Sequence, residues 1–172
     1  MEDNFQIQNK ETCNKDALRN TIQNLLSKGV SEFTSDIDIV YLQKLMHYLN
    51  FESVVLPHKK LIVLKDLAHD EDISYPWTEK NISQAHSIFV KLAHGGIIKK
   101  DVPVADLLIS KNWLDIGSDG EVELSERALV QFSDVILAAN GLYKKCQVCG
   151  FLCKNKNLHS ECEAILSKSQ HK

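Results

Sequence analysis

The sequence predicts an α+β chain, mainly helical, in which two small helix-and-hairpin units precede a short metal-binding end. Apolar residues recur at helical spacing in several stretches, and two pairs of β-rich runs are separated by turn-forming residues. Four of the five cysteines lie between Cys146 and Cys162. With 172 residues, 44% hydrophobic and 25% charged, the chain has the composition of an ordinary globular protein and room for two small domains.

The first unit is expected over residues 15–68, after a flexible arm of residues 1–14 that has no hydrophobic periodicity. Its first helix begins near Asp16 and ends at Gly29, where a left-handed C-terminal cap belongs. A second helix is expected to start at the capping residues 34–35. The predicted buried faces are Leu18, Ile22, Leu25 and Leu26 in the first helix, and Ile37, Tyr41, Leu42, Leu45, Met46 and Leu49 in the second.

A hairpin is expected to complete this unit. Two β-rich runs, Phe51–Leu56 and Leu61–Leu64, are broken by the turn-forming residues 57–60. Residues 69–77, which are rich in acids and turn formers, are then predicted to be the linker between the two units.

The second unit is expected over residues 78–141. A helix over residues 78–94 ends at a glycine pair, and Ile97 and Ile98 are expected to form a short strand. A second helix follows with Pro103 in its first turn, where proline is tolerated.

The clearest local signal is the hairpin over residues 113–124, whose turn contains an Asp-Gly pair. Ser125 is expected to cap one closing helix that runs as a continuous apolar stripe to Ala139, and Asn140 and Gly141 end it. One face of the hairpin is predicted to bury Leu114, Ile116, Val122 and Leu124.

Helix, strand, helix, two-stranded wing and closing helix is the order of a winged-helix domain. A DNA-reading domain of this type needs basic or amide side chains on the helix before the wing. Here that helix, residues 104–111, is mostly apolar, and the chain has a net charge of −3. The wing is acidic as well, with Asp115, Asp119, Glu121 and Glu123. We therefore expect a protein-docking module with weak or indirect DNA contact.

The end of the chain has the spacing of a zinc site. Cys146 and Cys149 form a C-x2-C pair, and His159 and Cys162 form an H-x2-C pair. Two such pairs complete a tetrahedron of sulfur and nitrogen ligands, which suits one structural zinc ion. Cys153 is an alternative ligand that could replace one of the four. The site is expected over residues 142–165, before a tail of residues 166–172.

Two other roles for these cysteines stay open, as redox-active thiols or as inert ones. Disulfides are disfavoured because the polar, acidic N-terminus does not resemble a signal peptide, so a reducing compartment is expected. No apolar run approaches the roughly 20 residues that span a bilayer, and no catalytic residues are identified. Residues 144–172 contain six lysines and two acids, a composition that is typical of a solvated basic end.

The run Asn112-Trp113-Leu114, the wing, residues 120–129 and the following C-x2-C together resemble the non-SMC element 1 proteins, over about residues 78–162. The resemblance implies two tandem winged-helix domains and a C-terminal variant RING. It also implies a nuclear subunit of the structural maintenance of chromosomes 5/6 complex, which acts in DNA repair and recombination. The implied partners are a MAGE-type non-SMC element 3 subunit and a kleisin subunit, with a ubiquitin-conjugating enzyme as a further candidate.

By position, the C-x2-C and H-x2-C pairs match the first and third ligand pairs of that RING, which share one zinc. The second pair is reduced to Cys153 and the fourth is missing, so the second zinc site cannot be built. The resemblance therefore implies a single-zinc RING remnant whose ubiquitin ligase activity is reduced or lost. The alternative function is a winged-helix and zinc-knuckle DNA-binding protein without ligase activity.

Overall fold

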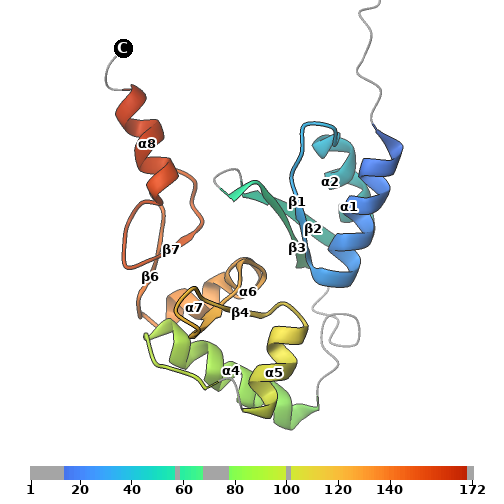
Figure 1. Ribbon diagram of the computed structural model, residues 1–172. Coiled ribbons are helices and arrows are strands. Elements are labelled where there is room, and N and C mark those ends of the chain that lie inside the picture. Colours follow the sequence, from blue (N-terminus) through green and yellow to red (C-terminus); the bar gives the residue numbers. More distant parts are fainter. Residues whose placement is uncertain (1–13, 57–58, 68–77, 100–101, 170–172) are drawn as a thin grey trace, which may run out of the picture.

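The computed structural model describes residues 14–56, 59–67, 78–99 and 102–169 (Figure 1). The predicted linker, nearly all of the predicted arm and the last residues of the tail lie outside these ranges. The described residues form the expected α+β fold, with two winged-helix-like units followed by a small hairpin and a helix.

Helix α1, Lys15–Lys28, has the predicted extent. Its N-cap is Asn14, the last residue of the predicted arm, whose side chain accepts hydrogen bonds from the N–H groups of Asp16 and Ala17. Its C-cap is Gly29, in the left-handed conformation at φ 73°, with its N–H bonded to the carbonyl of Leu25 at 2.9 Å. Both ends therefore follow from local capping chemistry.

Helix α2, Ile39–Tyr48, begins later than predicted, with Asp38 as its N-cap. The delay has a structural cause. The chain first forms strand β1, Val30–Glu32, and the N–H of Phe33 then donates to the carbonyl of Lys60 at 2.8 Å. The N–H of Ile37 next donates to the carbonyl of Thr34 at 3.4 Å, so residues 34–37 form a turn, and the helix begins only after Asp38, whose side chain accepts from the N–H of Tyr41 at 3.0 Å.

That sheet has three antiparallel strands in the order β1-β3-β2, where β2 is Phe51–Leu56 and β3 is Leu61–Asp66. The hairpin of β2 and β3 was predicted, although β3 runs two residues further, and its turn residues 57–58 lie outside the described ranges. The helices α1 and α2 cover one face of the sheet (Figure 1). The core between them consists of Leu25, Ile37, Leu42, Met46, Phe51, Ile62 and Leu64.

Three residues predicted for these buried helix faces are exposed instead. They are Leu26, Tyr41 and Leu49, which are 54%, 53% and 46% exposed. Leu26 and Tyr41 therefore lie on the solvent side of their helices, and Leu49 is the C-cap that follows α2.

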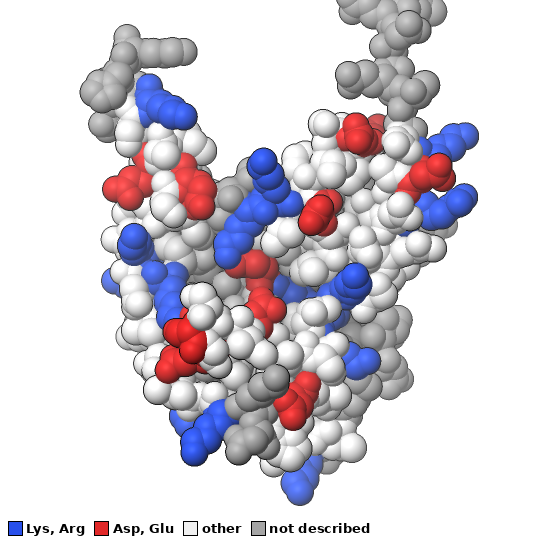
Figure 2. Space-filling model, in the orientation of Figure 1, with Lys and Arg blue, Asp and Glu red and all other residues white. Residues whose placement is uncertain are grey.

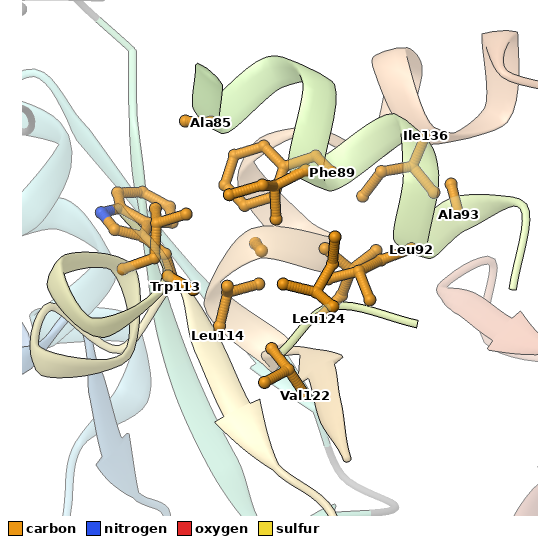
Figure 3. Packing of buried hydrophobic residues seen from close by; sticks show 14 of the residues in the cluster. Ala85, Phe89, Leu92, Ala93, Trp113, Leu114, Val122, Leu124 and Ile136 are labelled. Atoms are coloured by element: carbon orange, nitrogen blue, oxygen red, sulfur yellow. The ribbon is translucent and has the colours of Figure 1, made fainter. Parts of the chain in front are cut away.

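The second unit contains α4 (Glu79–Ala93), α5 (Pro103–Ser110), the wing strands β4 (Leu114–Ile116) and β5 (Val122–Leu124), and the closing helices α6 (Glu126–Gln131) and α7 (Ser133–Ala138). Its core packs apolar side chains of the α4 helix against Trp113 and the wing (Figure 3). Three sequence-based predictions for this unit are wrong.

The predicted strand at Ile97 and Ile98 is irregular chain; Ile98 is buried and Ile97 is exposed. In the wing, Ile116 is 45% exposed, while the other three predicted residues are buried. The closing helix is broken at Phe132, which has φ −107° and ψ 23°. The break places the ring of Phe132 5.0 Å from that of Phe89 and 5.2 Å from that of Trp113, centroid to centroid. Aromatic packing therefore outweighs helix continuity.

The two units are packed together through α6, which covers the second face of the first sheet. Val130 of α6 is buried with Leu56 and Val63 of the sheet. The side-chain amide of Gln131 accepts from the N–H of Asp66 at 2.8 Å and donates to its carbonyl at 3.3 Å. The units are thus joined directly by apolar packing and by two hydrogen bonds between the side chain of Gln131 and the backbone of Asp66.

The chain ends in a hairpin of β6 (Tyr143–Lys145) and β7 (Leu152–Lys154), followed by α8, Ser160–Ser169. This helix was not predicted and occupies part of the expected tail. Its Ile165 and Leu166 are exposed, so α8 has no buried stripe that a periodicity argument could detect. Among the described helices, none is both long and apolar enough to cross a bilayer.

Candidate metal centre

The first ligand pair lies in the turn between β6 and β7. Cys146 directly follows β6, and its N–H donates to the carbonyl of Phe151 at 2.8 Å. The turn closes with a bond of 2.9 Å from the N–H of Gly150 to the carbonyl of Cys146. Gly150 adopts φ 76°, a conformation that favours glycine. The tight turn therefore directs Cys146 and Cys149 towards one point.

The second pair lies at the start of α8. His159 precedes the helix, and its carbonyl accepts from the N–H of Glu163 at 2.9 Å. Cys162 lies in the first turn, where three-residue spacing places it on the same side as His159. The N–H of Gln147 donates to the carbonyl of Asn157 at 3.0 Å, which fixes the two turns relative to each other.

These four residues come together as the sequence predicted. Their ligand atoms all lie within 4.8 Å of one another. The Nδ1 atom of His159 is 3.4 Å from Cys149 Sγ and 3.9 Å from Cys162 Sγ. Ligands of a tetrahedral zinc ion are separated by about 3.5–3.8 Å, given bond lengths of about 2.0–2.3 Å. Cys146, Cys149, His159 and Cys162 could therefore bind one metal ion.

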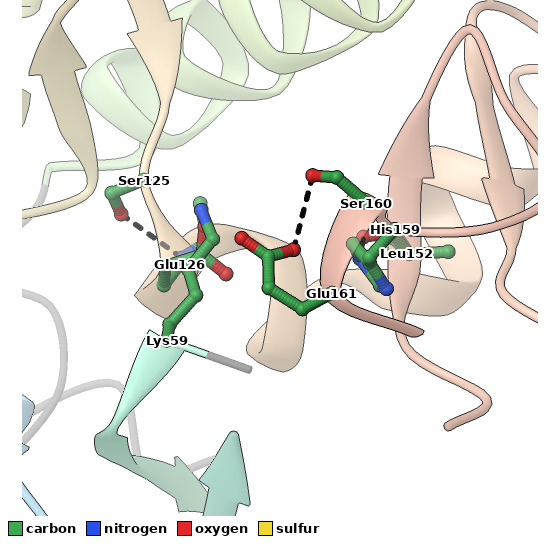
Figure 4. Close-up of polar contacts among 8 residues, drawn as sticks. Lys59, Ser125, Glu126, Leu152, His159, Ser160 and Glu161 are labelled. Atoms are coloured by element: carbon green, nitrogen blue, oxygen red, sulfur yellow. Dashed lines mark hydrogen bonds and ion pairs between the residues drawn. The ribbon is translucent and has the colours of Figure 1, made fainter. Parts of the chain in front are cut away.

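A contact behind the imidazole supports this arrangement. The Nε2 atom of His159 lies 3.0 Å from the carbonyl oxygen of Leu152 in β7 (Figure 4). A carbonyl can only accept, so Nε2 carries the proton and Nδ1 presents its lone pair to the cluster. Metal-binding histidines are commonly oriented by such a contact. Sequence reasoning did not identify Leu152, because a backbone contact leaves no residue-type signal.

The thiols of the cluster have divergent pKa values. At Cys146, burial raises the pKa, but hydrogen bonds from the backbone of Cys149, His159 and Val148 and from the Cys149 thiol outweigh it and lower the pKa to about 6. At Cys162, burial and the neighbouring thiols Cys146 and Cys149 raise the pKa to about 12. Cys146 is therefore readily held as a thiolate, whereas a cation that binds Cys162 must displace the proton of that thiol.

Cys153, the predicted alternative ligand, lies beside the cluster but outside the group of four. It is buried on β7, opposite Lys144 in the strand register. Its thiol donates to the carbonyl of Lys156 at 2.9 Å. Burial, followed by the neighbouring thiols Cys146 and Cys149, raises its pKa. In this geometry Cys153 serves the packing of the hairpin.

The turn between the ligands also reaches the rest of the protein. Phe151 packs against the cluster of Leu56, Val63 and Val130 at the contact between the two winged-helix-like units. The metal centre is therefore attached to both units. No pattern in the sequence indicates this role, because Phe151 is a single aromatic residue in a polar stretch.

On the face that Figure 2 displays, the basic and acidic side chains of the described residues are interspersed and form no continuous basic track. On the wing, Glu123 forms an ion pair of 2.9 Å with Lys154, and the pKa of Asp115 is raised, chiefly by burial and then by Glu126. Lys59 is paired with Glu126 across the two units (Figure 4).

No protein-family model matches the sequence, and no curated protein matches it. A search of solved structures finds a chain of a structure titled "Nse1-Nse3-Nse4 complex", with a TM-score of 0.56 and 15% sequence identity. The match covers 91% of this chain and 90% of that one. It confirms the predicted fold class and, at the level of the fold, the resemblance to non-SMC element 1 proteins. This chain and a chain of that complex share one fold along almost their whole lengths.

Proposed function

We propose that this protein is a subunit of a chromosomal structural maintenance of chromosomes 5/6 complex, in the position of non-SMC element 1. One observation carries the proposal: the fold match covers 91% of this chain and 90% of the other, and is therefore not confined to one common domain. A MAGE-type non-SMC element 3 subunit and a kleisin subunit are the proposed partners. DNA repair in the nucleus is the proposed setting.

Within this assembly, the protein acts as a scaffold and its metal centre has a structural role. Three cysteines and one histidine suit zinc and leave no position open for a substrate. Bound zinc would cross-link the β6–β7 turn to the start of α8. The carbonyl of Leu152 already orients His159 for the ion. Phe151, in the same turn, packs against residues of both units, so an ordered turn would also stabilise the contact between them.

Ubiquitin transfer is proposed to be reduced or lost. A RING ligase positions its conjugating enzyme with a groove shaped by two zinc loops. This chain has ligands for one loop, and between Cys149 and His159 it has a single cysteine, Cys153, in place of the second ligand pair. The α8 helix contains Cys162 in its first turn and continues to Ser169.

Co-purification tests the assembly. The full chain, expressed with a MAGE-type non-SMC element 3 subunit and a kleisin subunit, is expected to elute with both from a sizing column. Ubiquitin discharge from a panel of conjugating enzymes is expected to stay at the rate without this protein. Failure to elute with either subunit contradicts the assembly, and zinc-dependent acceleration of discharge contradicts the scaffold role.

A further inference from the structure

Strand β2 forms an edge of the first sheet. Within the described part of the chain, the order β1-β3-β2 places β1 at one edge and β2 at the other. β1 has three residues, whereas β2 has six, of which Glu52 is the one charged residue and none is proline or glycine. Proteins usually protect exposed edges with short strands, charges, proline or bulges. The short β1 has such protection, whereas β2 relies on one carboxylate.

Backbone hydrogen bonds show which residues of β2 face this edge. Just before the strand, the carbonyl of Asn50 accepts from the N–H of Leu67 at 3.0 Å, so Asn50 directs its backbone towards β3. In an antiparallel ladder, successive residues bond the neighbouring strand or turn away from it in alternation. Residues 52, 54 and 56 therefore bond β3, and residues 51, 53 and 55 turn their N–H and C=O groups to the edge.

Ser53, in the middle of this edge, has polar atoms without good partners. The residue is only 4% exposed, and its hydroxyl has no hydrogen-bond partner among the described residues. Its carbonyl accepts a long bond of 3.4 Å from the side-chain amide of Gln43 in α2. Buried polar groups without partners are uncommon in folded proteins. The Gln43 amide thus lies where the N–H of an added strand would donate, and its flexible side chain can turn away.

The surface is hollowed on both faces of β2. A groove of ≈ 330 Å³ lies on the α2 side, where Phe51 and Ser53 line it. A cleft of ≈ 260 Å³ lies on the α6 side, between Val54 and the turn that holds Phe151. Glu52 borders both hollows, so they meet at this strand. Successive side chains of an extended segment point to opposite faces, so an added strand would place them alternately in the two hollows.

The chemistry of the edge selects a polypeptide as its occupant. The edge offers N–H donors and C=O acceptors at strand spacing, and a second peptide backbone matches both, whereas a phosphate backbone has no donor. The α2 helix lines one side of the edge and the turn of the metal centre lines the other. A single extended segment fits between them, whereas a second copy of this chain would bring its own helix and turn to the same place.

We propose that β2 is a docking site for an extended segment of another protein, which adds a fourth strand to the first sheet. The backbone of this segment bonds residues 51, 53 and 55. One of its side chains bonds the hydroxyl of Ser53, and apolar side chains on its other face enter the cleft beside Val54 and Phe151. The binding requires an extended segment and no further subunit, so it does not depend on membership in the proposed complex.

Amide hydrogen exchange tests the added strand directly. The ¹⁵N-labelled full chain, loaded with zinc, is titrated with a peptide of about ten residues that alternates valine with threonine between a terminal lysine and a terminal glutamate. At saturation, exchange of the amide protons of residues 51, 53 and 55 is expected to slow by about tenfold or more. The amide protons of residues 52, 54 and 56 already bond β3 and should change by less than about twofold.

Proline substitutions on the two edges of the sheet give a matched pair. Val55→Pro removes an N–H that faces the edge and leaves the bonds to β3, so it is expected to weaken binding by about tenfold or more. Glu32→Pro is the control on β1, where Phe33 bonds Lys60 of the hairpin and Glu32 therefore faces outwards. It should alter binding by less than about twofold. Thermal unfolding of each variant verifies that it is folded.

Methylated peptides test the same bonds without changing the protein. Two versions of the peptide carry N-methyl groups on alternate residues, one on each set. An added strand directs one set of N–H groups to β2 and the other to solvent, so one version is expected to bind and the other to lose binding.

Three results would overturn the proposal. One is no saturable binding of the unmethylated peptide up to about 1 mM. The second is equal binding of the two methylated peptides, which would show that side chains alone make the contact. The third is protection of residues 51, 53 and 55 that grows with protein concentration in the absence of peptide, which would assign the edge to a second copy of this chain.

Discussion

The side chain of Arg127 lies against Gly29, in the space that a Cβ atom at this glycine would occupy. The guanidinium lies 4.0 Å from the centroid of the Trp113 ring, and its Nη1 donates to the carbonyl of Lys111 at 2.8 Å. Nearby, the side-chain amide of Asn112 donates to the carbonyl of Lys28 at 3.2 Å. The end of α1 in the first unit is thereby joined to the start of the wing in the second.

Gly29→Ala is therefore expected to lower the free energy of unfolding by about 2–3 kcal/mol. Part of this loss is the cost of φ 73° for a residue with a side chain, and the rest comes from displacing Arg127 off Trp113. Urea denaturation measures the change. Gly120→Ala is the control, because Gly120 has φ 82° but no atom within 4 Å of an added Cβ. It should cost about 1 kcal/mol, and equal losses in the two variants would show that Arg127 is not displaced.

Zinc content tests the ligand set. The purified protein is expected to carry one zinc ion per chain by elemental analysis, and Cys146→Ala and His159→Ala should each lose it. Three remaining ligands bind zinc far more weakly than a closed tetrahedral set. Cys153→Ala is the matched control and should retain the ion, because its thiol donates to Lys156. Loss of zinc from this variant would make Cys153 a ligand.

The features that the sequence predicted best depend on local chemistry. Gly29 ends α1 through its own left-handed backbone conformation, and Ser125 begins α6 through its own side chain, which accepts from the N–H of Ala128. The four metal-cluster residues were found because both pairs have short spacings that bring ligand atoms together regardless of the remaining fold.

The features that were missed depend on tertiary contacts. Strand β1 has three residues, too few to show alternation, and exists because it pairs with β3. The closing helix breaks because Phe132 packs between Phe89 and Trp113, which are distant in the sequence. Helix α8 lacks a buried apolar face, so the hydrophobic periodicity of the sequence could not predict it. The contact of Leu152 with His159 uses only a carbonyl, which every residue has.

Phe151→Ala is expected to lower the free energy of unfolding by about 1–2 kcal/mol with zinc bound, less than for a fully buried phenylalanine because Phe151 is only partly buried. Denaturation with and without a chelator measures this. Without zinc the loss should shrink, since the turn no longer holds Phe151 against Val130. Ile165→Ala, at a 61% exposed position, is the control and should change stability by less than about 0.5 kcal/mol. The same loss in both metal states would show that Phe151 packs independently of the metal.

Tyr143 is expected to make stability depend on pH in the alkaline range. Burial, followed by the charges of Glu123 and Glu126, raises the pKa of its hydroxyl from 10.0 to about 12. The folded protein therefore holds this proton more tightly than the unfolded chain does. The stabilisation is fully present below pH 10 and is lost as the pH rises through about 12. The free energy of unfolding should fall by about 1–2 kcal/mol more than in Tyr143→Phe over this range.

Two measurements check this expectation. Ultraviolet titration of tyrosinate, taken as the difference between the protein and Tyr143→Phe, should show one hydroxyl ionising near pH 12. Denaturation at matched pH values, with zinc bound in both proteins, gives the stability difference, and the cysteines titrate alike in the two. The strand pairing of Tyr143 with Lys154 uses backbone groups only, so the variant retains the hairpin. If both proteins lose stability equally as the pH rises, the buried hydroxyl of Tyr143 is not the cause.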